Sequence, residues 1–141
     1  MEKNEFKEYI KKYLYQHGFE KIKNKFYRKE KDFVCVIWVF KSIYGEYYHF
    51  DINFFIGSFD KPYVFIQKSG HEYTPSVYPK TFVCEYLKYD EEQLLVTLEE
   101  QMNNVILPPF ELGKKYLLDN FGTMYRTVLV DEKSVKKLLS E

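Results

Sequence analysis

The sequence predicts a single α+β domain, residues 1–141, with an antiparallel sheet of four to five strands, an N-terminal helix and a C-terminal helical segment. Three observations indicate this fold. A chain of 141 residues is the size of one domain and can bury a core without a disulfide or a structural metal. Aromatic residues make up 20% of the chain, which favours a pleated sheet. Apolar residues recur at helical spacing near both ends and with strand patterning between them.

The first elements are a helix and a hairpin. Asn4 to His17 carries apolar residues at helical spacing, and Gly18 follows where a left-handed C-terminal cap is expected. A short ribbon from Phe19 to Arg28 comes next, with Asn24 in its turn.

Two longer strands are expected in the middle of the chain. Phe33 to Ser42 is apolar on both faces, which predicts a central strand covered on both sides along most of its length, with Trp38 buried. A turn at Tyr44 to Glu46 follows. Tyr47 to Gly57 then alternates between large apolar residues and polar ones. One of its faces is therefore predicted to pack on the core, while the other is wet or covered only in part.

Shorter elements are expected between this hairpin and the second long helix. Tyr63 to Gln67 is interpreted as a short strand, and Thr81 to Tyr89 as another. Between them, Ser69 to Pro79 contains Gly and Pro residues that predict a loop.

The C-terminal segment is predicted to be helical. Asp90, with Gln93 three residues later, forms a capping-box pattern that opens a long helix. Pro108-Pro109 is expected to end this helix after Ile106. A shorter helix is expected from Phe110 to Asn120. The structure of Met124 to Val130 is ambiguous. Asp131 is expected to cap a final helix.

Charge and cysteine usage limit the class of protein. Lys plus Arg and Asp plus Glu number 21 each, so net charge gives no attraction to nucleic acid or to an anionic membrane. Cys35 and Cys84 both lie in apolar runs and form no C-x-x-C pair, which predicts buried free thiols in a reducing compartment. We find no signal peptide and no apolar run of membrane-spanning length. The chain is therefore expected to be cytoplasmic.

Four segments carry a resemblance to a known family. They are GFEKIKNKFYR (Gly18 to Arg28), VIWVFKS (Val36 to Ser42), FDINFFIG (Phe50 to Gly57) and ILPPFE (Ile106 to Glu111). With the leading helix, this order resembles a bacterial family of uncharacterised domains, domain of unknown function 4304, over roughly Phe6 to Asn120. Members usually carry Gln where Phe40 stands here, which removes one polar group that a shared site would use. The resemblance supports the fold and implies no activity.

Sequence signatures of common catalytic chemistry are missing. The chain has no G-x-G-x-x-G, no phosphate-binding loop, no H-E-x-x-H, no G-x-S-x-G and no Cys/His cluster with zinc spacing. We therefore expect no catalytic residue, no cofactor and no metal.

The strongest polar constellation lies on the alternating strand. His49, Asp51 and Asn53 are two residues apart, so their side chains project from the same face. Tyr47 precedes them, and Lys41 and Ser42 stand across the hairpin. These six residues are the candidate binding site for a polar ligand or a protein partner. General acid–base work, metal binding and an ordinary solvated surface are the alternatives.

The preferred functional hypothesis is a non-catalytic interaction module that binds a protein partner. An immunity-type inhibitor that masks a toxin is one form of such a module. The alternative is a small-molecule-binding domain or enzyme with its site around His49, Asp51 and Asn53. A deep pocket lined by these residues would favour the alternative, and a flat polar-aromatic patch would favour the interaction module.

Overall fold

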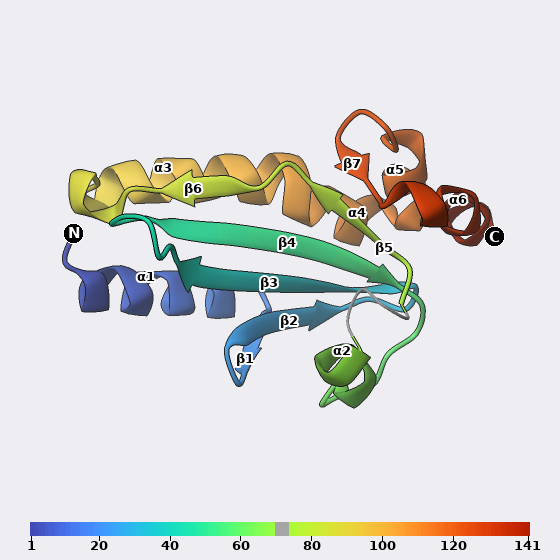
Figure 1. Cartoon of the computed structure of the whole chain (residues 1–141), viewed down its shortest axis with the longest axis horizontal. Helices are drawn as coiled ribbons and strands as arrows, with labels where there is room; N and C mark the ends of the chain where they lie inside the picture. Colours follow the sequence, from blue (N-terminus) through green and yellow to red (C-terminus); the bar gives the residue numbers. More distant parts are fainter. Residues whose placement is uncertain (70–73) are drawn as a thin grey trace.

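A computed structural model describes residues 1–69 and 74–141 of the chain, and it shows an antiparallel sheet with helices on both faces (Figure 1). In chain order the helices and strands are α1 (Lys3–Gln16), β1 (Glu20–Ile22), β2 (Lys25–Lys29), β3 (Phe33–Lys41), β4 (Tyr48–Ile56), α2 (Val64–Ser69), β5 (Ser76–Pro79), β6 (Phe82–Cys84), α3 (Glu91–Gln101), α4 (Leu107–Leu112), α5 (Lys114–Asp119), β7 (Tyr125–Arg126) and α6 (Glu132–Ser140). The predicted α+β class and antiparallel sheet are confirmed. Within the described residues the sheet has seven strands, more than the four to five expected.

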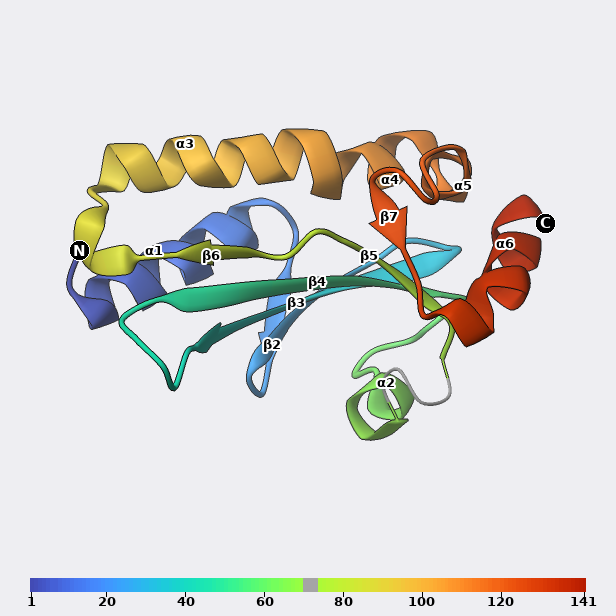
Figure 2. The ribbon, with the colours of Figure 1, turned by 45° about the horizontal axis from the view of Figure 1, so that its top comes forward.

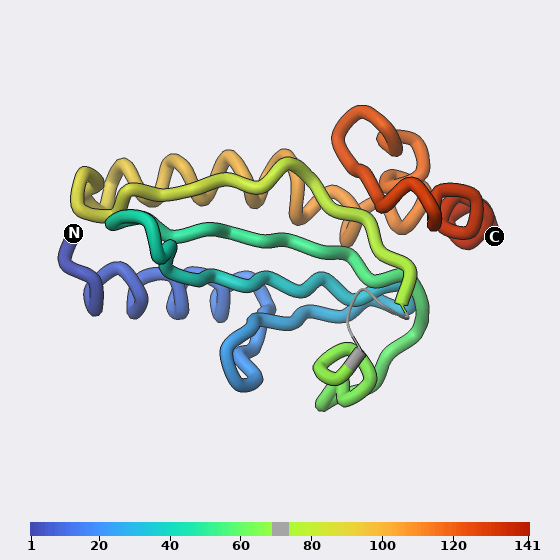
Figure 3. Tube along the Cα trace, viewed as in Figure 1, coloured from blue at the N-terminus to red at the C-terminus, as the bar shows by residue number. Residues whose placement is uncertain are grey.

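The strand order is β1-β2-β3-β4-β5-β7, and β6 also pairs with β4. The longest pairing joins β3 to β4, from Phe33 opposite Ile56 to Lys41 opposite Tyr48. On the other side of β4, β5 and β6 follow one another along the same strand, as the trace in Figure 3 shows. Part of the predicted loop from Ser69 to Pro79 is therefore a strand, and residues 70–73, including His71, lie outside the described part.

One face of the sheet carries the main core, and we call it the core face. The predicted alternation of β4 is confirmed, because its even-numbered residues pack there against α1 and α3. The buried side chains shared by this core include Phe6, Ile10, Phe33, Cys35, Ile37, Phe50, Ile52, Phe54, Leu94, Leu98 and Met102.

The opposite face, which we call the second face, is covered over only part of its length. In Figure 2, α2 lies on the side of the sheet opposite to α3. Tyr63 and Ile66 pack there on a small cluster of buried side chains from β2, β3 and β4, which are Tyr27, Val34, Val36 and Phe55. Beyond this cluster Trp38 is only half-buried. The expectation of a strand covered on both faces along most of its length, with Trp38 buried, is therefore wrong beyond Ile37.

The segment interpreted as a short strand, Tyr63 to Gln67, is instead helical from Val64, where α2 begins. Ile66 is 4% exposed and faces the sheet, whereas Val64 and Phe65 are 48% and 53% exposed. An apolar run this short has no clear period, so its residues alone do not distinguish a strand from a helix.

The predicted capping box opens α3. The Asp90 carboxylate accepts a hydrogen bond of 2.8 Å from the Gln93 backbone N–H, and the Gln93 side chain accepts one of 3.0 Å from the Asp90 N–H. These bonds satisfy backbone donors that have no partner within the helix.

Pro108-Pro109 does not end the helical path, contrary to expectation. The chain continues from α3 through a π-helical turn, Met102–Ile106, into α4, and the prolines occupy the first turn of α4. A proline there removes an N–H that would otherwise reach the carbonyl four residues earlier. For Pro109 that carbonyl belongs to Val105, and the Tyr125 hydroxyl donates a hydrogen bond of 2.6 Å to it.

Three further predictions near the C-terminus need correction or refinement. The expected helix from Phe110 to Asn120 is two helices, α4 and α5, separated at Gly113 with a φ of 83°. The predicted strand from Thr81 to Tyr89 is a strand only at β6, and a 3-10 turn, Tyr86–Lys88, brings the Tyr86 ring into the core. The ambiguous segment from Met124 to Val130 contains β7 and the start of a second 3-10 turn, Leu129–Asp131.

Gly18 ends α1 as predicted, with a φ of 83°. The Arg28 guanidinium donates a hydrogen bond of 2.9 Å to the His17 carbonyl and lies 4.1 Å from the centre of the Phe110 ring. A Cβ atom at position 18 would approach Arg28 Nε to 3.3 Å. Arg28 therefore joins the end of α1 to β2 and α4.

Candidate functional site

The part of the second face over which no described segment packs is the candidate functional site, and we call it the open half. It consists of half-buried side chains from β2, β3, β4 and the residue before β4, which are Lys25, Trp38, Phe40, Tyr47, His49 and Asp51. The strand register brings them together, because Trp38 lies opposite Asp51 and Phe40 lies opposite His49. Cross-strand partners of this kind have neighbouring side chains on one face.

The open half is a row of rings in contact. The Trp38 and Phe40 ring centres are 4.2 Å apart, and the Phe40 and His49 rings stack at 4.9 Å with an interplanar angle of 18°. Tyr47 meets the His49 ring edge-on at 5.3 Å. Lys25 Nζ lies 5.1 Å from the centre of the Trp38 ring. Such contacts hold aromatic side chains in defined positions relative to one another.

A small hollow of about 120 Å³ adjoins the row of rings. Lys25, Trp38, Asp51 and Asn53 line it, and Ile66 of α2 contributes to its wall. Asn53 is 6% exposed, whereas Asp51 is half-buried. Within the described residues Asp51 forms no ion pair. The hollow therefore presents a carboxylate and an amide beside an aromatic ring.

Two of the candidate binding residues lie apart from the others. Lys41 is opposite Tyr48, so its position belongs to the core face, and its ammonium group pairs with Glu46 at 3.6 Å. Ser42 is 5% exposed, and its hydroxyl accepts a hydrogen bond of 3.0 Å from the Tyr44 N–H. Both residues stabilise the β3–β4 turn. The other four candidate residues lie together on the second face, and they are Tyr47, His49, Asp51 and Asn53.

Sequence reasoning missed Trp38, Phe40 and Lys25 as members of the site. The even-numbered residues of β3 and the odd-numbered residues of β4 share the second face only because Lys41 pairs with Tyr48. A turn one residue longer or shorter would instead bring the other set of β4 side chains to the face that Trp38 and Phe40 share. The alternation of β4 was visible in the sequence, but the register that pairs it with β3 was not.

The turn beside the open half is anchored to the core. The Tyr86 hydroxyl donates a hydrogen bond to the Glu46 carboxylate, which raises the pKa of Tyr86 to about 12 and lowers the pKa of Glu46. In Figure 2 the β3–β4 connection bends toward the side of the sheet on which α2 lies. Its tip carries Ile43 and Tyr44, which are 88% and 87% exposed. The open half thus lies between this turn and α2.

The two cysteines lie in the protein core. Cys35 and Cys84 are both 0% exposed, as expected for buried free thiols. Burial raises the pKa of both, and that of Cys84 reaches about 11, so neither thiol is a ready nucleophile. Residues 1–69 and 74–141 contain no cluster of His, Cys, Asp and Glu that could hold a metal ion. No helix in those ranges has the length and apolar character needed to cross a membrane.

Comparison with known proteins yields a family match. Residues 10–112 match the family described as domain of unknown function (DUF4304). No curated protein and no solved structure matches the chain. The matched segment begins inside α1 and ends with α4, so it contains every residue of the open half.

Proposed function

Because the chain belongs to the DUF4304 family of domains of unknown function, which supplies no activity, we propose a function from the geometry of the open half. The protein is an interaction module without catalysis, and it binds a protein partner through this surface. The row of contacting rings on an uncovered sheet face is the observation that carries the proposal.

Aromatic side chains held in place are effective binding groups. They bury a large area on contact and lose little conformational entropy. Trp and Tyr are also enriched among the residues that contribute most to the binding energy of interfaces. The open half also has a polar margin formed by Lys25 and Asp51. An apolar centre with a polar margin is the usual composition of a protein–protein interface.

The charges on this surface indicate what the partner presents. Asp51 is a half-buried carboxylate without an ion pair in the described part of the chain, and it borders the Trp38 ring. A Lys or Arg side chain of the partner would pair with Asp51 while neighbouring apolar side chains cover Phe40 and Tyr47. Arg is favoured, because its planar group also stacks on aromatic rings.

The shape of the surface supports this proposal over a small-molecule site. Pockets for drug-sized ligands are usually about 300–1,000 Å³ and enclose most of the ligand. The hollow beside Asp51 and Asn53 is about 120 Å³, and His49 is not among the residues that line it. A domain that covers a surface of another protein can act as an inhibitor, so an immunity-type role is compatible with this geometry. The free thiols of Cys35 and Cys84 fit a cytoplasmic setting.

Selection of random displayed peptides on the immobilised wild-type protein tests the proposal, because selected peptides converge on surfaces that are organised for binding. We expect enriched peptides to combine Arg or Lys with aromatic or aliphatic residues. Phe40→Ser should weaken their binding by about tenfold or more, and Asp51→Asn should weaken it less, since these variants remove part of the ring row and the charge respectively.

Val96→Ser is the matched control. Val96 is 56% exposed on α3, on the other side of the sheet, so its replacement also removes an exposed apolar side chain. Peptide binding should be unchanged in this variant. The proposal fails if no peptide is enriched, or if enriched peptides bind Phe40→Ser as well as the wild type. It also fails if the chain self-associates through this surface, which sedimentation of wild type and Phe40→Ser would reveal.

A further inference from the structure

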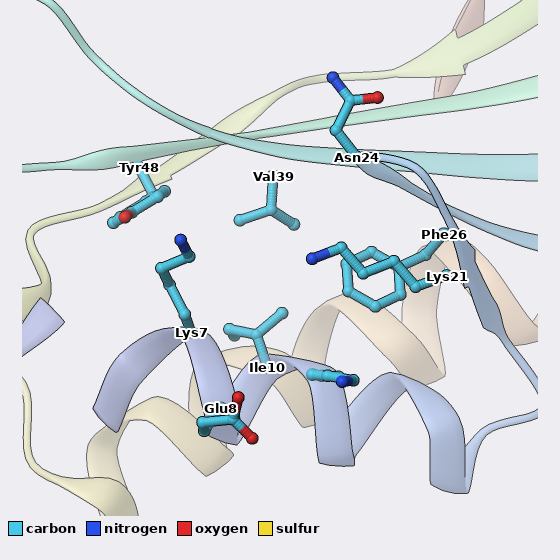
Figure 4. Close-up of a pocket in the computed structure, with 9 residues that line it drawn as sticks. Lys7, Glu8, Ile10, Lys21, Asn24, Phe26, Val39 and Tyr48 are labelled. Carbon is cyan, nitrogen blue, oxygen red and sulfur yellow. The ribbon is translucent and has the colours of Figure 1, made fainter. Parts of the chain in front are cut away.

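A cavity on the core-face side of the sheet is a separate candidate site. It has a volume of about 310 Å³ and lies between α1 and the edge of the sheet formed by β1, β2 and the end of β3 (Figure 4). The strand register places Lys21 opposite Phe26, so the side chains of both residues belong to this face. The open half lies on the second face, so the two sites are independent.

The cavity exists because α1 presents lysines, in place of apolar residues, to this end of the sheet. Ile10 points to the sheet and is 2% exposed, whereas Lys7 and Lys11, one helical turn apart, line the cavity. Val39 of β3 therefore stays half-buried although it belongs to the core face.

Cations without ion pairs gather at this cavity. Lys7, Lys11 and Lys21 line it, and none of them forms an ion pair within residues 1–69 and 74–141. Figure 4 shows the Lys7 and Lys21 ammonium groups directed toward the space beside Val39 from opposite sides. Glu8, the acidic residue of the lining, is directed away from both ammonium groups in that view. Within residues 1–69 and 74–141, Glu8 forms no ion pair with the lysines of the lining.

The floor of the cavity is apolar. Ile10, Phe26 and Val39 form it, and Lys21 Nζ lies 5.9 Å from the centre of the Phe26 ring. Tyr48, which is 4% exposed, and Asn24 in the β1–β2 turn also line the cavity. An apolar floor below several ammonium groups suits a molecule with an anionic end and an apolar body.

We propose that this cavity binds a small amphipathic anion, a carboxylate or phosphate attached to an aromatic ring or a short acyl chain. Lysine ammonium groups bind either oxyanion as point charges. The volume is near the lower limit for ligand pockets, which restricts the apolar body to a few carbon atoms beyond one ring. The ring or acyl chain lies on Phe26 and Val39, and the anionic group lies between Lys7 and Lys21.

Titration calorimetry with four probes tests this proposal on the full chain. Octanoate and phenyl phosphate each carry both an anionic group and an apolar body. Octanol has only the apolar body, and inorganic phosphate has only the charge. At least one amphipathic anion should bind at about 1 mM or below, and more tightly than octanol and inorganic phosphate. Binding should weaken as salt increases, because exposed charges are screened.

Substitution of the lysines locates the site. Lys7→Gln and Lys21→Gln keep a polar, slightly shorter side chain but remove the charge, and each should weaken binding by about fivefold. Lys12→Gln is the matched control, because Lys12 is exposed on the same helix and does not line the cavity. Thermal unfolding of each variant verifies that the fold is retained. The proposal is overturned if no amphipathic anion binds, if octanol binds equally well, or if Lys12→Gln weakens binding as much as Lys7→Gln.

Discussion

The covered and open halves of the second face have the same strands and the same register, yet they differ in what lies above them. In the covered half, Val34, Val36 and Phe55 are buried under Tyr63 and Ile66. In the open half, Trp38 and Phe40 continue the same row of β3 positions, but no described segment packs over them, and they remain half-buried. Periodicity therefore determines the face to which a side chain points, and it leaves open how far along the strand that face is covered.

The lengths of the elements explain where coverage ends. β3 has nine residues and so extends about 30 Å. α2 has six residues and is only about 9 Å long. A helix this short covers a fraction of the strand, so the large apolar side chains beyond it stay accessible. We therefore expect substitutions in the covered half to lower the free energy of unfolding more than substitutions in the open half.

The largest effect is expected in the covered half. Phe55 is 4% exposed and packs in the cluster under α2. Phe55→Ala should lower the free energy of unfolding by about 3–5 kcal/mol, because it removes a buried ring and leaves a cavity. Equilibrium unfolding in urea measures this loss. A loss below about 1 kcal/mol would contradict the packing of α2 on this half.

An intermediate effect is expected for Trp38 in the open half. Its ring is half-buried and contacts Phe40 and Lys25. Trp38→Ala should cost about 1–2 kcal/mol, less than Phe55→Ala, because part of the ring already contacts water. In the wild type, iodide should quench the fluorescence of this single tryptophan in part. A stability loss equal to that of Phe55→Ala, with no quenching, would show that the open half is covered.

The smallest effects are expected for the polar residues of the open half. His49→Ala and Asp51→Ala should each change the free energy of unfolding by no more than about 0.5 kcal/mol, since both side chains are half-buried on an uncovered surface. Thermal and urea unfolding provide the measurement. Destabilisation of about 2 kcal/mol or more by either change would indicate a buried polar network in place of an accessible binding surface.

Elements specified by nearby residues were predictable from the sequence. The Asp90 and Gln93 side chains form the expected capping box, and Gly18 adopts the expected positive φ. The alternation of β4 placed Phe50 and Ile52 in the core and Asp51 on the other face. Each of these features depends on residues that are a few positions apart in the chain.

Features that depend on distant residues were not predictable in the same way. The helical path passes Pro108-Pro109, and the carbonyl of Val105, four residues before Pro109, accepts a hydrogen bond from the distant Tyr125 hydroxyl. Similarly, the membership of Trp38 and Phe40 in the candidate site depends on the register of the β3–β4 hairpin. The polar row from His49 to Asn53 was visible in the sequence, but the rings beside it required the pairing of two strands.

The contact between Tyr125 and Val105 also bears on where this folding unit stops. The family match ends at residue 112, whereas fully buried side chains of the same core come from beyond it, namely Leu117, Tyr125 and Val135. Tyr125 further satisfies a backbone carbonyl that lies inside the matched segment. A truncation after residue 112 would therefore remove buried side chains from the main core and expose its apolar surface to water. The smallest fragment that keeps this core intact extends past the region that defines the family, through α6.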